Sequence, residues 1–145
     1  MAWTEPTADE IGTIVRGAKL VAVVGMKGEA SASAPAYTVP ARMREVGIRI
    51  IPVNPTIRES LGVPALASLS QLNETPDVIQ VFRRPEALGP LGDEILALPA
   101  SKRPKVVWMQ SGIASIPVAE KLEAGGMRVV MDRCFAVELA KHHRR

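Results

Sequence analysis

Five short apolar runs recur along the chain, and each stops abruptly at polar, glycine, proline or cysteine residues. Each run has the length of a strand and predicts a buried strand with an exposed carboxyl end. Helix-sized intervals separate the runs, which is typical of an α/β fold with an open parallel five-stranded sheet. Ligands of such sheets bind beyond the carboxyl ends of the strands. The five predicted strands are Leu20–Val24, Ile48–Ile51, Val78–Val81, Lys105–Trp108 and Arg128–Met131.

Helical patterns lie between and before these runs. Thr7-Ala8-Asp9-Glu10 has the form of a capping box, and apolar residues follow it at helical spacing as far as Ala18. A helix is therefore expected before the first strand. Pro52 and Pro55 follow the second run, and their fixed φ angles prevent the strand from continuing as an ordinary ladder. Further helices are predicted at residues 37–46, near 68–72, at 91–98, and from Ser115 or Ile116 to Gly125-Gly126.

Composition limits the classes of protein that remain. A chain of 145 residues suits one domain, and 47% hydrophobic with 23% charged residues is ordinary for a globular protein. The net charge of +3 is mild, and four basic or partly basic residues lie in the terminal segment His142–Arg145. Aromatic residues make up only 3%, too few to stack many bases, so we expect no nucleic acid partner. A local anion site fits the charge better.

Cysteine usage and the start of the chain indicate the compartment. The single Cys134 excludes an intrachain disulfide and agrees with a reducing cytoplasm. The first residues are acidic and polar, whereas a signal peptide needs a positive start and an apolar segment. No run approaches the ~20 apolar residues of a membrane span. We therefore expect a cytoplasmic protein with no membrane partner and no metal site.

The ends of the first two strands argue against the common nucleotide fingerprints. Gly25-Met26-Lys27-Gly28 supplies only two of the glycines of a dinucleotide loop, and the second strand ends at neutral Asn54 instead of an acidic residue. Lys27-Gly28-Glu29 reverses the order of a P-loop. What remains is a loop that offers backbone N–H groups, one lysine and a helix N-terminus, all suited to phosphate.

The ordered set of strand-end motifs resembles a known family. VAVVGM, GIRIIPVNP, LGVPALASLSQL, DVIQVFRRPEA, KVVWMQSGI and GMRVVMDRC together resemble the small stand-alone coenzyme A-binding proteins over about residues 12–140. These proteins are similar to the N-terminal domain of the succinyl-CoA synthetase alpha subunit. The resemblance implies a Rossmann-like sheet in the order 3-2-1-4-5 with helices on both faces. It also implies one domain over residues 1–145, with a short N-terminal extension, a flexible basic C-terminal tail and coenzyme A across the carboxyl edge.

The resemblance also assigns ligand contacts, residue by residue. The loop after the first strand would hold the nucleotide part of coenzyme A, and the turn after the second would border the adenosine; a packing turn or a rigid corner are the alternatives. Arg58 would reach the 3′-phosphate unless it is simply solvated. Cys134 would line the ligand or serve packing. The implied contacts are Gly25, Met26, Lys27, Gly28, Val53, Asn54, Pro55, Arg58, Phe82, Arg83, Arg84, Gln110, Gly112, Ile113 and Cys134.

The chain departs from the family pattern at three positions. Ala36 replaces a serine that is often found before the Tyr37 position, which removes a hydroxyl contact or helix cap. Thr56 stands where relatives commonly have lysine, and Phe135 replaces the usual proline after the cysteine. These departures leave the expected fold intact and bear on ligand affinity and on the final turn.

The combined pattern favours a binding module for coenzyme A or an acyl-CoA over an enzyme. The phosphorylated histidine of the synthetase lies in a second domain that this chain does not carry. Three alternatives remain open: an NAD(P)-dependent enzyme, an acyl-CoA-processing enzyme that uses Cys134, and a regulatory subunit that senses acyl-CoA with a protein partner or as a homo-oligomer. Both histidines, His142 and His143, lie in the tail, so no general base accompanies the thiol in its motif.

Overall fold

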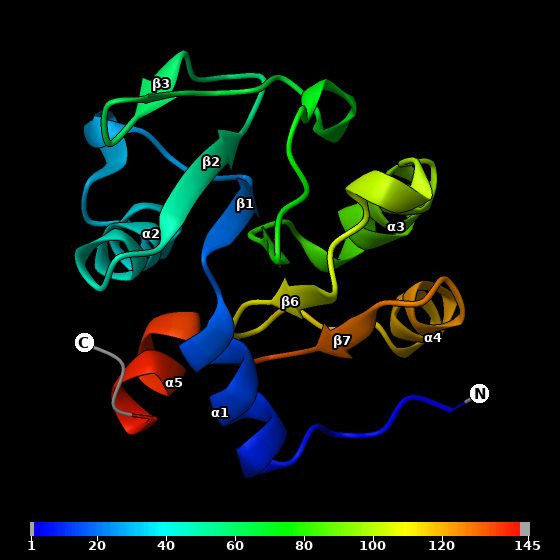
Figure 1. Ribbon diagram of the computed structural model, residues 1–145. Helices are drawn as coiled ribbons and strands as arrows, with labels where there is room; N and C mark the ends of the chain where they lie inside the picture. The colour runs from blue at the N-terminus through cyan, green and yellow to red at the C-terminus, as the bar shows by residue number, and fades with distance from the viewer. Residues whose placement is uncertain (1, 143–145) are drawn as a thin grey trace.

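The computed structural model describes residues 2–142, and the fold within them is a parallel sheet with helices on both faces (Figure 1). The terminal residues 143–145, which include most of the expected basic tail, lie outside the described part. The strands of the sheet are β1 Leu20–Val24, β2 Arg49–Val53, β5 Val78–Val81, β6 Val106–Met109 and β7 Arg128–Val130. A small antiparallel hairpin consists of β3 Glu59–Ser60 and β4 Val63–Pro64. The helices are α1 Ala8–Gly17, α2 Pro35–Glu45, α3 Leu88–Leu96, α4 Ile116–Ala124 and α5 Phe135–Lys141.

The five-stranded sheet is parallel throughout and has the order β2-β1-β5-β6-β7. The Rossmann-like α/β class is thus confirmed. The third sheet strand along the chain, β5, pairs with β1. On the outer side of β2, Leu66 makes an isolated parallel bridge with Val53, so the pattern of the expected order 3-2-1-4-5 is kept with the connector in the outermost position. Counted along the chain, the order is 2-1-3-4-5. The direction of strand addition therefore reverses between β1 and β5, and the carboxyl ends of these two strands border a crevice there.

Pro52 gives the physical reason why β2 is an edge strand. A proline has no N–H to donate and is confined to sheet edges, first positions or bulges. Its carbonyl oxygen accepts from Leu66 N at 2.9 Å, and Leu66 O accepts from Asn54 N at 2.8 Å, so this side of β2 faces the connector instead of another sheet strand. An interior position would have required a ladder bond that proline cannot make.

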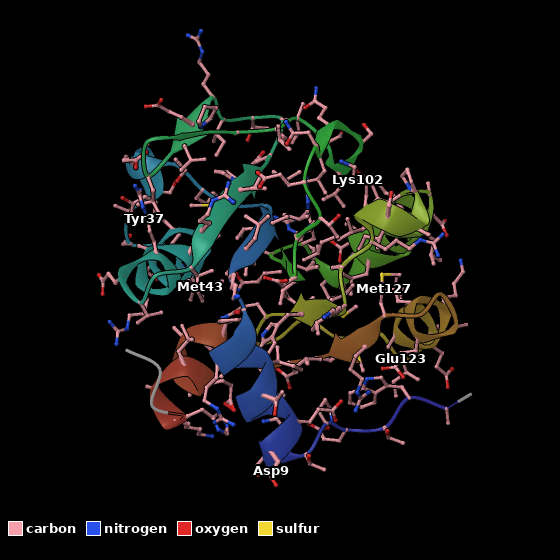
Figure 2. All side chains as sticks on the ribbon, in the orientation of Figure 1. Asp9, Tyr37, Met43, Lys102, Glu123 and Met127 are labelled. Atoms are coloured by element: carbon pink, nitrogen blue, oxygen red, sulfur yellow. The ribbon has the colours of Figure 1, made fainter. Side chains whose placement is uncertain are left out.

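Apolar side chains fill both spaces between the sheet and its helices (Figure 2). Alternate residues of each strand point to opposite faces, so Val21 and Val23 pack with α1, α2 and α5, while Ala22 and Val24 pack with α3 and α4. The rings of Trp108 and Phe135 are in contact in the first of these layers, with centroids 4.6 Å apart. All the strands of the sheet are therefore buried on two faces, as a parallel sheet requires.

The N-terminal segment before α1 covers the other edge of the sheet. The Trp3 indole Nε1 donates to Val129 O on β7 at 2.8 Å. Arg128 of the same strand donates to Thr4 O at 2.9 Å and pairs with Glu10 at 2.7 Å. The predicted capping box is half realised, because Thr7 accepts from Glu10 N while the Glu10 carboxylate turns to Arg128. This pairing lowers the pKa of Glu10.

Candidate functional site

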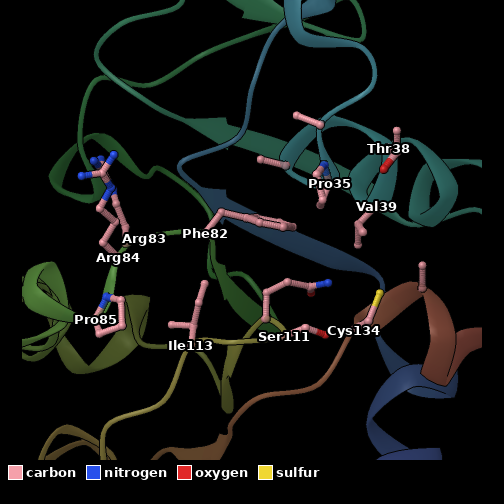
Figure 3. A pocket seen from close by; sticks show the side chains of 14 residues that line it. Pro35, Thr38, Val39, Phe82, Arg83, Arg84, Pro85, Ser111, Ile113 and Cys134 are labelled. Atoms are coloured by element: carbon pink, nitrogen blue, oxygen red, sulfur yellow. The ribbon is translucent and has the colours of Figure 1, made fainter.

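A cavity of about 800 Å³ lies at the carboxyl edge of the sheet, beside the reversal between β1 and β5 (Figure 3). Its walls come from the N-terminal half of α2, from the segments that follow β5 and β6, and from the start of α5. No acidic side chain lies among its lining residues. The lining residues are Ala34, Pro35, Ala36, Thr38, Val39, Phe82, Arg83, Arg84, Pro85, Gln110, Ser111, Ile113, Cys134 and Ala136.

Gly25 turns the chain sharply at the end of β1. Its φ of +83° is unfavourable for residues with a Cβ, and its N–H donates to Val53 O at 2.8 Å. A Cβ at this position would lie 2.2 Å from the carbonyl oxygen of Phe82. Glycine is therefore required by both conformation and space, and it brings the chain directly across the end of β5.

Asn54 clamps this turn to the end of β2. Its side chain is buried, with Nδ2 donating to Met26 O at 2.9 Å and Oδ1 accepting from Thr56 N and Thr56 Oγ1. The loop is held again at Lys27, whose N–H donates to Ala36 O and whose carbonyl accepts from Ser60 Oγ at 2.7 Å. The first loop therefore supports the start of α2, where the cavity begins.

The N-terminus of α2 presents an unoccupied donor to the cavity. Its N-cap, Ala34, has no side chain that can cap, and Pro35 has no N–H. The N–H of Ala36 has no partner among residues 2–142. An uncapped helix N-terminus of this kind carries partial positive charge and suits a phosphate or another anion.

Two arginines add positive charge to the same cavity. Figure 3 shows Arg83 and Arg84 at one end and Cys134 at the other, with Phe82 between them. Within the described part of the chain neither arginine has an acidic partner, and Arg83 is half-buried while Arg84 is exposed. Guanidinium groups of this kind can bind phosphate bidentately. One end of the cavity is thus cationic and the other end is largely apolar.

Gln110 lines the cavity, and its bonded partner Gln80 is buried behind it. Gln110 is 4% exposed, and its Oε1 accepts from Gln80 Nε2 at 2.9 Å and from the backbone N–H of Phe135 at 3.3 Å. Gln80 is fully buried, and its own Oε1 has no hydrogen-bond partner among the described residues. The pair links β5, β6 and the first residue of α5 beneath the cavity.

Cys134 is the N-cap of α5, and its half-buried side chain lines the apolar end. The lining residues include no histidine or carboxylate that could take its proton. A thiol without a base is a weak nucleophile at neutral pH. The arrangement is therefore suited to binding near the thiol more than to hydrolysis.

Six of the residues inferred from the sequence line the cavity, and the others do not. Met26 and Val53 are buried in the core, Asn54 is turned inward, and Gly112 forms a turn with φ +80° whose N–H donates to Asp132. Lys27, Pro55 and Arg58 are exposed on loops outside the lining. The inferred residues in the lining are Phe82, Arg83, Arg84, Gln110, Ile113 and Cys134, and those outside it are Gly25, Met26, Lys27, Gly28, Val53, Asn54, Pro55, Arg58 and Gly112.

The inference from the sequence missed most of the wall that α2 provides. The start of α2 could have been located from Pro35, which follows a run of small residues, since proline favours the first position of a helix. Ala36 therefore sits inside the first turn and not at the cap, and its side chain faces the cavity. The lining residues missed are Ala34, Pro35, Ala36, Thr38, Val39, Pro85, Ser111 and Ala136.

Two negative findings concern residues 2–142 alone. Within this range no helix has the length and apolar character that crossing a bilayer requires. Over the same residues, no group of histidine, cysteine, aspartate and glutamate side chains is arranged to hold a metal ion.

Known proteins resemble this chain over almost its whole length. The family model described as CoA binding domain matches residues 19–140. The Bacillus subtilis (strain 168) protein YneT is 36% identical over 132 residues, which are 91% of this chain and 93% of YneT. The Thermus thermophilus protein cell-free ID.343 superimposes with a TM-score of 0.86 at 39% identity, covering 94% of this chain and 99% of that chain.

The same fold occurs as part of a larger enzyme. An acetyl-coenzyme A synthetase of the dinucleotide-forming kind, from Ca. Korarchaeum cryptofilum, matches with a TM-score of 0.61 at 17% identity. The match covers 77% of this chain but only 25% of the synthetase. At this identity the likeness concerns the fold alone.

Proposed function

The chain belongs to the CoA binding domain family, and on that premise we propose that it binds coenzyme A or an acyl-CoA in the cavity at the carboxyl edge of its sheet, without turnover. The observation that carries the proposal is the polarity of the cavity, with two unpaired arginines at one end and apolar side chains at the other. Coenzyme A has the same polarity, since its phosphates lie at one end of a long and mostly uncharged pantetheine.

The phosphates are assigned to the cationic end. Arg83 and Arg84 supply the charge there, and the N–H of Ala36 at the start of α2 offers a further donor to the cavity. Lys27 and Arg58 are exposed on neighbouring loops, which the contact between Ser60 Oγ and Lys27 O holds together. They are assigned to the part of the nucleotide that extends beyond the cavity, as the family resemblance implies.

The pantetheine is assigned to the apolar end. Phe82, Val39 and Ile113 offer apolar contact along the cavity, and Cys134 borders its far end. A ligand chain without charge needs a groove and few polar partners. The assignment places the sulfur end of the ligand near α5.

We expect coenzyme A and acetyl-CoA to bind at least tenfold more tightly than NAD or NADP. A dinucleotide site normally uses an acidic group after the second strand for the ribose hydroxyls. Here that position holds Asn54, whose polar atoms are already bonded to Met26 O and Thr56. Isothermal titration calorimetry at one salt concentration compares the four ligands, and equal or tighter binding of either dinucleotide would reverse the proposal.

We also expect Cys134→Ala and Cys134→Ser to bind coenzyme A with nearly unchanged affinity and the parent protein to hydrolyse no acyl-CoA. The reason is that no base lies in the cavity lining to activate the thiol. Thiol release from acetyl-CoA measures hydrolysis, and calorimetry measures affinity. A hydrolytic rate in the parent that both variants lose, with affinity preserved, would instead make the protein an acyl-CoA-processing enzyme.

A further inference from the structure

The orientation of the Gln110 amide is fixed by a backbone group. The Phe135 N–H can only donate, so the Gln110 atom that faces it at 3.3 Å must be the oxygen. Gln80 approaches the same oxygen at 2.9 Å and must therefore present its amide nitrogen. Both acceptor positions of Gln110 Oε1 are thus filled. Its Nε2 is left as a donor that cannot exchange places with the oxygen.

This donor has no protein partner. Among residues 2–142, Gln110 Nε2 makes no hydrogen bond to a protein acceptor, although the residue is only 4% exposed and lines the cavity. Gln80 Oε1 is likewise buried without a partner among the described residues. Buried polar groups are normally satisfied by protein or ordered water. A nearly buried donor at the cavity wall is accordingly set for an acceptor on the ligand.

The position of this donor identifies the part of the ligand it meets. Phe135, which anchors Gln110, directly follows Cys134 at the start of α5. Cys134 and the arginines Arg83 and Arg84 lie at opposite ends of the cavity (Figure 3). If the arginines hold the phosphates, the end of the ligand near Gln110 is the sulfur end. At the sulfur end an acyl-CoA offers the thioester carbonyl oxygen, where free coenzyme A has a thiol, a weak acceptor. The amide carbonyls of the pantetheine lie further along the chain and are common to both ligands.

We propose that Gln110 Nε2 donates a hydrogen bond to the thioester carbonyl of a bound acyl-CoA, and that this contact makes the protein prefer acyl-CoA to ligands without that carbonyl. This inference rests on the proposed function and adds the class of ligand. Gln80 does not line the cavity, and the Phe135 N–H by itself fixes the orientation of the Gln110 amide. No covalent step is involved.

The test compares acetyl-CoA with S-ethyl-CoA, which has nearly the same shape but lacks the carbonyl oxygen. Wild-type protein should bind acetyl-CoA about fivefold more tightly, the ratio expected for one neutral hydrogen bond. Gln110→Met keeps the length of the side chain and should reduce the ratio to about one. Gln80→Leu is the matched control: it removes a buried amide next to Gln110 but leaves the Phe135 N–H in place, so the ratio should stay above about threefold.

A second measurement needs no variant. The carbonyl stretch of acetyl-CoA labelled with carbon-13 at the carbonyl should move to lower frequency on binding, since a hydrogen bond weakens the C=O bond. A wild-type ratio near one, a ratio that survives in Gln110→Met or disappears equally in Gln80→Leu, or an unshifted band would overturn the inference while coenzyme A binding stands. Absence of binding by coenzyme A, acetyl-CoA and S-ethyl-CoA alike would overturn the proposed function itself.

Discussion

Gly25→Ala should destabilise the protein by about 3 kcal/mol, the sum of about 1–2 kcal/mol for a positive φ and about 1–3 kcal/mol for overpacking. The new Cβ would lie 2.2 Å from Phe82 O, which is backbone and cannot rotate away. The turn also carries the bond from Gly25 N to Val53 O, so movement would disturb the ends of both β2 and β5. Thermal and urea unfolding followed by circular dichroism measure the loss, expected at ~10 °C in Tm.

Gly112→Ala is the matched control for this substitution. Its φ of +80° is nearly the same as the +83° of Gly25, but a Cβ there would meet no atom within 4 Å. Its cost should be limited to the conformational part, about 1 kcal/mol. The difference between the two variants isolates the close approach to Phe82. Equal losses would mean that the chain relieves the contact by a small shift at the end of β1.

Replacing Arg83 and Arg84 together by alanine should weaken coenzyme A binding by ten- to a hundredfold. A charge-assisted hydrogen bond contributes about 1.5–3 kcal/mol when it is poorly solvated and much less when it is exposed. Arg83 is half-buried and Arg84 exposed, so the single Arg83→Ala variant should account for most of the loss. Calorimetry with coenzyme A and with dephospho-coenzyme A measures both affinities.

The two ligands distinguish which phosphate the arginines bind. A loss confined to coenzyme A indicates the 3′-phosphate, and an equal loss for both ligands indicates the diphosphate. Arg42→Ala removes one positive charge from the last turn of α2, where Arg42 pairs with Glu45 at 2.9 Å, and controls for the change in net charge. Unchanged affinity in the double variant would assign Arg83 and Arg84 to the solvated surface.

The sequence predicted the strands well because burial on both faces leaves a continuous apolar run. All five runs became strands of the parallel sheet, with boundaries displaced by no more than two residues, and Ser115 caps α4 as expected by accepting from Val118 N. No single run indicated which strand would pair with the third run in the sheet. Pro52 carried that information, since a residue without an N–H is poorly suited to the interior of a sheet.

The site was harder to predict because side chains near strand ends have two directions open to them. Asn54 was assigned to the ligand, yet its amide bonds to Met26 O and Thr56, a choice that depends on a loop 28 residues away. Conversely, the small residues from Ala34 to Ala36 offered no chemistry of their own and line the cavity through the helix they begin. Phe82, Arg83 and Arg84, which the sequence places at the ligand, do line the cavity, because they follow a buried strand directly.

The contacts of Trp3 with β7 constrain the order in which the molecule can be completed during synthesis. Trp3 Nε1 meets Val129 O across 126 positions of sequence, and Arg128 reaches Thr4 across 124. Since the ribosome delivers the N-terminal segment first, this segment must wait until Arg128 and Val129 have emerged before it can dock. The edge of β7 is then covered as soon as it is made, because its partner is already present. Closure of this edge of the sheet is thus a late event that joins two segments more than 120 positions apart in the sequence.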